Sequence, residues 1–124
     1  MSVETRLPPQ EDLRSRALLS LQRALLGEVT QEVLAVSMEI SPESLHIWVY
    51  HGGMTPEEQE HFDGCAVSQV LADFPYPERG DPAIDSTFVL CGGSGRIVFR
   101  GVLAFARSGL SWASASNERP RRDA

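Results

Sequence analysis

The stretch from Thr55 to Pro75 constrains the fold most, because it carries the signals of both a helix start and a helix end. Thr55 is a good N-cap, Pro56 suits the first helical position, and Glu58 follows the cap by three residues, as in a capping box. From Phe62 onward apolar residues recur at helical spacing, which predicts that the second half of the helix lies on a core. Pro75 ends the helix, since the residue before a proline is pushed out of helical geometry.

Patterns on the N-terminal side of this helix predict another helix and a pair of strands. Residues 11–26 are amphipathic with helical spacing, and Gly27 follows them as the left-handed residue that commonly ends a helix. Residues 33–40 and 45–50 alternate apolar and polar side chains and are joined by a short turn. The connection predicts an antiparallel hairpin.

Two further strands are expected on the C-terminal side, at residues 87–91 and, as one long strand, at residues 96–107, where Gly101 marks a bend or bulge. The order helix, strand, strand, helix, strand, strand predicts an α+β domain of two layers, with a four-stranded, mainly antiparallel sheet and two helices on one face. This single domain is expected to span residues 11–113. A flexible N-terminal segment at residues 1–10 and a disordered tail at residues 114–124 flank it.

The second strand of the predicted hairpin has two different faces. Its aliphatic residues share one face and should meet the helices, whereas its rings share the other face: His46, Trp48 and Tyr50. In a two-layer domain the row of rings is left on the open face of the sheet, where aromatic side chains are typical of binding hot spots. The competing interpretation is that the C-terminal segment covers the rings or that they pair across the sheet.

The chain of 124 residues is long enough to bury a core without a disulfide or a structural metal. No apolar run approaches the roughly 18 residues of a membrane span, and the N-terminus has no apolar segment typical of a signal peptide. We therefore expect a cytoplasmic protein with no membrane partner. Cys65 and Cys91 are expected to be buried free thiols, because disulfides are rare in a reducing compartment, and a disulfide between them is the less favoured alternative.

Acidic residues are concentrated in the middle of the chain. Residues 28–85 hold twelve acidic residues and one arginine, whereas the net charge of the whole chain is only −6. Such a field repels the phosphates of nucleic acid and favours association with a basic protein. The competing interpretation is that the acidic surface only keeps the protein soluble. The first two turns of the predicted helix carry four of these residues: Glu57, Glu58, Glu60 and Asp63.

Residues capable of metal or nucleophilic chemistry are few: His46, His51, His61 and Cys65. His61 and Cys65 are four positions apart on the predicted helix. Cys65 falls on the apolar stripe, however, and the sequence has neither a Cys-x-x-Cys nor a His-x-x-x-His pair. We therefore expect no catalytic residue, no metal site and no cofactor. A ligand-binding domain or an enzyme that uses these side chains is kept as an alternative.

Three segments carry a family resemblance: residues 24–30 (ALLGEVT), 50–58 (YHGGMTPEE) and 70–75 (VLADFP). They resemble the "ALLGE", "DG-x-(S/T)-x-EE" and "VIADFP" landmarks of a partly uncharacterised group of small bacterial proteins. Some members of that group are assigned as immunity proteins for polymorphic or contact-dependent toxins. Past Asp81 the chain departs from the pattern of the group. The resemblance implies a non-enzymatic protein that binds and neutralises a toxin.

The resemblance and the charge distribution together predict a cognate basic toxin, such as a nuclease, as the partner. The acidic residues Glu57, Glu58, Glu60 and Asp63 are expected to steer and pair with the toxin, and Trp48 and Tyr50 to act as anchors. A different class of function is an alternative. In that reading, a small structural or adaptor domain associates with itself, for example as a homodimer, through the open face of the sheet.

Overall fold

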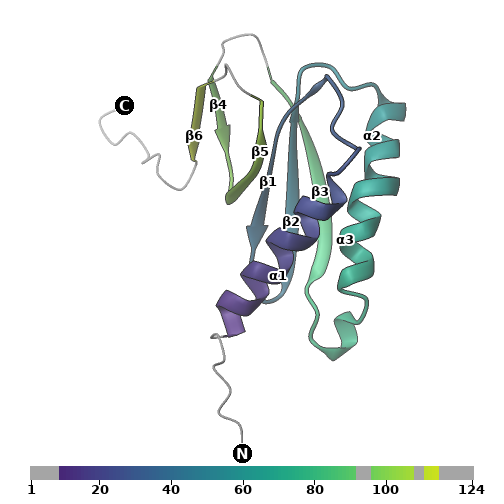
Figure 1. The fold of residues 1–124 in the computed structure, drawn as a ribbon, viewed down its shortest axis with the longest axis vertical. Helices are drawn as coiled ribbons and strands as arrows, with labels where there is room; N and C mark the ends of the chain where they lie inside the picture. The colour runs from purple at the N-terminus through teal and green to yellow at the C-terminus, as the bar shows by residue number, and fades with distance from the viewer. Residues whose placement is uncertain (1–8, 92–95, 108–110, 115–124) are drawn as a thin grey trace, which may run out of the picture.

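A computed structural model describes residues 9–91, 96–107 and 111–114 (Figure 1). The predicted glycine turn at residues 92–95 and most of the two predicted flexible segments lie outside these residues. The helices and strands follow the expected order at first: α1 (Pro9–Ala24), β1 (Val33–Ile40), β2 (Ser44–His51), α2 (Pro56–Phe62), a π-helical turn (Asp63–Val67) and α3 (Ser68–Asp73). The C-terminal part then contains a 3₁₀ turn (Pro77–Arg79), β3 (Ala83–Leu90), β4 (Arg96–Phe99), β5 (Val102–Ala106) and β6 (Ser111–Ser114).

The main sheet has four strands in the order β3-β2-β1-β5. β1 pairs antiparallel with both β2 and β5, which confirms the predicted hairpin and the mainly antiparallel sheet of an α+β fold. β3 instead pairs parallel with β2 and begins at Ala83, four residues earlier than predicted. The helix between β2 and β3 explains this direction, because it carries the chain back to the end of the sheet where β2 starts.

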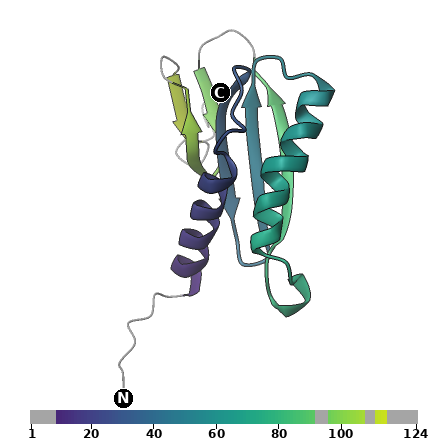
Figure 2. The ribbon, with the colours of Figure 1, turned by 45° about the vertical axis from the view of Figure 1, so that its right-hand side comes forward.

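Both helices lie on one face of the main sheet, as predicted (Figures 1 and 2). The aliphatic residues of β2 meet them there, and Leu45, Ile47 and Val49 are fully buried. We call the continuous helical segment formed by α2, the π turn and α3 the second helix. Together with these β2 residues, the second helix and α1 form one apolar core, to which they contribute Phe62, Ala66, Val70 and Phe74, and Ala17, Leu21 and Ala24, respectively. This apolar layer fixes the second helix on the sheet and leaves its first turn at the end of the molecule.

The prediction of one long strand at residues 96–107 is wrong, because this segment forms two strands, β4 and β5. The break falls at Gly101, whose φ of +76° lies in the left-handed region that favours glycine. β5 joins the main sheet, whereas β4 pairs with β6 in a separate two-stranded parallel sheet. The break at Gly101 therefore allows β4 and β5, which are adjacent in sequence, to join different sheets.

The sheet face opposite the helices is partly covered, which corrects the expectation of an open face. Ile97 of β4 is buried against Ala35 and Tyr50 of the main sheet, and Phe99 packs at the edge of the same cluster. Part of the fold thus has a third layer, and the alternative interpretation of the sequence, in which the C-terminal segment covers the rings, describes this face better.

Candidate partner-binding surface at the start of the second helix

The start of α2 is fixed by the predicted capping box. The Thr55 side chain accepts a hydrogen bond from the Glu58 backbone N–H at 3.1 Å, and the Glu58 carboxylate accepts one from the Thr55 N–H at 2.8 Å. Glu58 is therefore partly committed to holding the helix start. Glu57 and Glu60 are exposed, so their charges face solvent beside the positive end of the helix.

Asp63 faces a different direction from the other three predicted acidic residues. Its carboxylate accepts a hydrogen bond of 2.8 Å from the Ser86 hydroxyl on β3, and the residue is half-buried. This contact ties the middle of the helix to the edge strand of the sheet. The structure therefore brings Glu57, Glu58 and Glu60 to one end of the helix and separates Asp63 from them.

A shallow pocket of about 170 Å³ adjoins the first turn of α2. Met54 and Phe62, both buried, provide apolar lining, and three glutamate residues, Glu28, Glu57 and Glu58, also border it. Glu28 was not among the predicted site residues. It follows Gly27, whose φ of +81° is left-handed as predicted, although α1 itself already ends at Ala24. Only the tertiary structure brings this turn beside α2. We call Glu28, Glu57, Glu58 and Glu60 the acidic surface.

His51 holds the loop that leads into α2. Its Nδ1 accepts hydrogen bonds from the backbone N–H groups of Gly53, at 3.2 Å, and Met54, at 2.9 Å. Burial lowers the pKa of His51 below its ordinary value, and the nearby carboxylates of Glu32 and Glu58 oppose that effect. Because Nδ1 must stay unprotonated to accept both bonds, the neutral form of His51 supports this loop.

The other two histidines have different surroundings. The His46 Nε2 lies 2.6 Å from the Thr87 hydroxyl, and the His46 ring packs against Trp48 with ring centres 4.5 Å apart. His61 lies on the exposed side of α2, with its Nε2 3.4 Å from a Glu28 carboxylate oxygen and 3.6 Å from the Cys65 sulfur. Only His61 therefore meets Cys65, and the three histidines form no common site.

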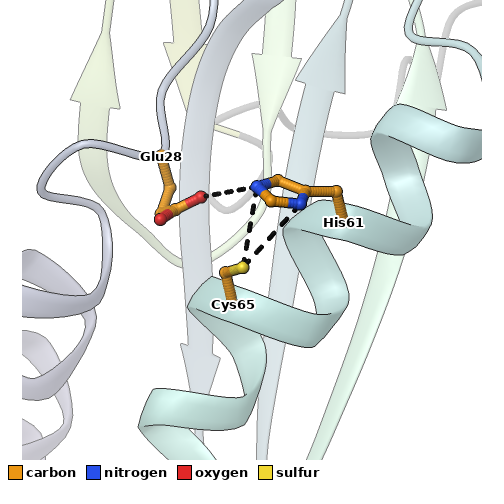
Figure 3. A group of neighbouring side chains, drawn as sticks. All are labelled: Glu28, His61 and Cys65. Carbon is orange, nitrogen blue, oxygen red and sulfur yellow. Dashed lines mark hydrogen bonds and ion pairs between the residues drawn. The ribbon is translucent and has the colours of Figure 1, made fainter.

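Cys65 does not lie on the apolar stripe where the sequence placed it. It falls within the π-helical turn and is half-buried, and its sulfur approaches the His61 ring (Figure 3). A π turn takes an additional residue, so side chains beyond it are rotated relative to an uninterrupted α-helix. Cys91, the second cysteine, is also free and half-buried, and burial raises the pKa of its thiol.

The two predicted aromatic anchors hold the second sheet in place. Tyr50 is only 3% exposed, and its hydroxyl contacts the Ser37 hydroxyl at 3.2 Å and accepts a hydrogen bond of 2.8 Å from the Arg100 N–H. Trp48 is half-buried: its indole N–H donates to Glu39 at 2.8 Å, and the Arg100 guanidinium lies 5.3 Å from its ring centre. Neither aromatic residue belongs to the acidic surface.

No helix among the described residues is long and apolar enough to span a membrane. Comparison with the sequences of curated proteins gives no significant match. Residues 14–89 match the model of a family described as MafI2 immunity protein, which confirms the resemblance to small immunity proteins. Since this match covers more than half of the chain, the protein belongs to the MafI2 immunity protein family.

Proposed function

We propose that this protein neutralises a cognate basic toxin by binding it through the acidic surface. Family membership supports an immunity function. The observation that carries the choice of surface is the pocket beside α2, because it combines buried apolar residues with three bordering glutamates. Binding alone accounts for neutralisation, so the proposal contains no catalytic step, no cofactor and no nucleic-acid partner.

The pocket suits the side chain of an arginine or a lysine from the toxin. The aliphatic part of such a side chain would pack on Met54 and Phe62, while its charged end would meet Glu28 or Glu57. Glu60 adds negative charge from the same helix and would strengthen steering over a longer range. The acidic surface would thus imitate the phosphates that a nuclease-type toxin binds, and cover its basic cleft.

Three of the predicted binding residues take different parts in this proposal. Asp63 is bonded to Ser86, so it contributes to the field of the helix rather than to direct pairing. Tyr50 supports the second sheet from a buried position, and Trp48 retains some exposed surface.

A nuclease-type toxin would act where nucleic acid is found, and the proposal therefore places this protein in the cytoplasm.

The test begins with capture of a partner by the tagged full-length chain from a lysate of the bacterium that encodes it. Mass spectrometry identifies the captured protein, which is then expressed in a host cell with and without this chain. The proposal predicts a basic protein that stops growth alone and is harmless when this chain is present. A captured protein that is acidic, or whose toxicity persists with this chain present, would contradict it.

A further inference from the structure

Glu28, His61 and Cys65 form a mixed cluster of carboxylate, imidazole and thiol at the edge of the pocket (Figure 3). Their ligand atoms all lie within 4.8 Å of one another. Glu28 comes from the turn after α1, whereas His61 and Cys65 come from successive turns of the second helix. The cluster therefore depends on the tertiary structure, and not on a run of neighbouring charges.

We propose that these three side chains bind one zinc ion. Zinc is commonly held by this combination of sulfur, nitrogen and oxygen ligands. Two ligands four residues apart on a helix lie on one face and can reach the same ion. Cys65 lies within the π turn, and its sulfur is 3.6 Å from the His61 Nε2.

The distances between the ligand atoms fit a tetrahedral ion. Bonds of about 2.0 to 2.3 Å to zinc require separations of roughly 3.3 to 3.7 Å between any two ligand atoms. His61 Nε2 is 3.4 Å from the Glu28 oxygen and 3.6 Å from the Cys65 sulfur, so two of the three separations lie in this range. A small rotation of the Glu28 side chain would bring the remaining pair closer.

The surroundings allow an ion to enter and to be held. The side chain of His61 is 68% exposed and that of Glu28 is 24% exposed, so one ligand is open to solvent while another is partly protected. On binding, the Cys65 thiol releases its proton to solvent, and His61 binds through Nε2 with its proton on Nδ1. Thiolate and carboxylate together then balance the two positive charges of the ion. Water or a group from a partner takes the fourth position.

The sequence argued against a metal site because it placed Cys65 on the apolar stripe and contained neither a Cys-x-x-Cys nor a His-x-x-x-His pair. In the structure Cys65 lies beside His61, and Glu28, which the sequence did not single out as a ligand, completes the cluster. The zinc site does not depend on the proposed toxin binding. A bound ion would compete with a basic side chain of the toxin for Glu28, and for this reason the site is tested on the protein alone.

The experiment titrates zinc into the reduced, full-length protein by calorimetry and by competition with a zinc indicator of micromolar affinity. We expect one zinc ion per chain. Each of the variants Cys65→Ser, His61→Gln and Glu28→Gln should weaken binding at least about tenfold, because each removes a direct ligand. Cobalt should give a thiolate-to-metal absorption band that disappears in Cys65→Ser.

Matched controls distinguish the site from adventitious binding. Cys91→Ser removes the other free thiol and His46→Gln a histidine outside the cluster, so both should bind zinc as the unaltered protein does. Circular dichroism checks that every variant is folded. The proposal is overturned if the unaltered protein binds no zinc stoichiometrically, if Cys91→Ser loses as much affinity as Cys65→Ser, or if Glu28→Gln binds zinc normally.

Discussion

Gly101 is the position where a single methyl group should disturb the fold most. An alanine there would adopt a φ of +76°, which costs about 1–2 kcal/mol for a residue with a Cβ. The new Cβ would also clash with the Met38 carbonyl oxygen and lie 2.9 Å from the Glu39 Cα. These are backbone atoms of β1, which is paired on both sides and cannot move away from the contact.

The contact can be relieved only if the start of β5 shifts away from β1. Such a shift breaks the pairing of Val102 with Met38 and loses one or two ladder hydrogen bonds, each with a net value of about 0.5–1.5 kcal/mol. Together with the backbone strain, Gly101→Ala should lower the free energy of unfolding by about 2–5 kcal/mol. That is a large part of the roughly 5–15 kcal/mol that stabilises a typical domain.

Urea denaturation followed by circular dichroism measures this change, with Gly64→Ala as the matched control. Gly64 lies in the π-helical turn, has no positive φ and has no atom within 4 Å of the place a Cβ would take. Its replacement should be harmless or stabilising by up to about 1 kcal/mol. If Gly101→Ala were as stable as the unaltered protein, our description of the β4–β5 connection would be refuted.

Three further changes test the elements that position the acidic surface and the second sheet. Thr55→Ala removes the side chain of the capping box and should lower the free energy of unfolding by about 1 kcal/mol in thermal or urea denaturation, whereas Thr55→Ser should not. Tyr50→Phe leaves the Ser37 hydroxyl and the Arg100 N–H without this partner and should cost about 1–3 kcal/mol, and an unchanged stability would show that these contacts are unimportant. Because the pKa of His51 is lowered in the folded protein, the unfolded chain takes up the proton first; stability should be full above about pH 6.5 and fall as the pH drops below it. The urea midpoint should be measured from about pH 7.5 to about pH 5.5, a range that roughly spans the ordinary pKa of histidine. His51→Gln should make the loss of stability over this range smaller.

Local sequence signals predicted those features that depend on neighbouring residues. The capping box of Thr55 and Glu58, the left-handed Gly27 and the antiparallel pairing of β1 with β2 all formed as expected. Each of these requires only a few residues of context. The family resemblance had the same basis, because it rested on short segments within the matched region.

The features that sequence reasoning missed depend on packing between distant segments. Nothing near residue 83 indicates that β3 pairs parallel with β2, and nothing near residue 97 indicates that β4 covers Tyr50. The π turn that contains Cys65 was not predicted either. Glu28 joins the acidic surface only because the turn after α1 packs beside α2. Its position after a helix-ending glycine is the one clue that the sequence offers.

The central claim is that a toxin is bound through the acidic surface, and the rate of association with the captured toxin tests it most directly. The double variant Glu57→Arg/Glu60→Arg changes exposed charges at the start of α2 and leaves Glu58 to hold the cap. The matched control, Glu43→Arg/Glu78→Arg, makes the same change in net charge at the opposite end of the molecule, before β2 and after α3 (Figure 1).

Stopped-flow measurement at low and moderate salt gives the rate of association for each protein. The account predicts that the reversal at α2 slows association by at least about tenfold and removes most of its dependence on salt, because steering by charge is screened by ions. The control reversal should have a much smaller effect. Equal rates for the two double variants, or an α2 variant that associates as fast as the unaltered protein, would contradict the claim.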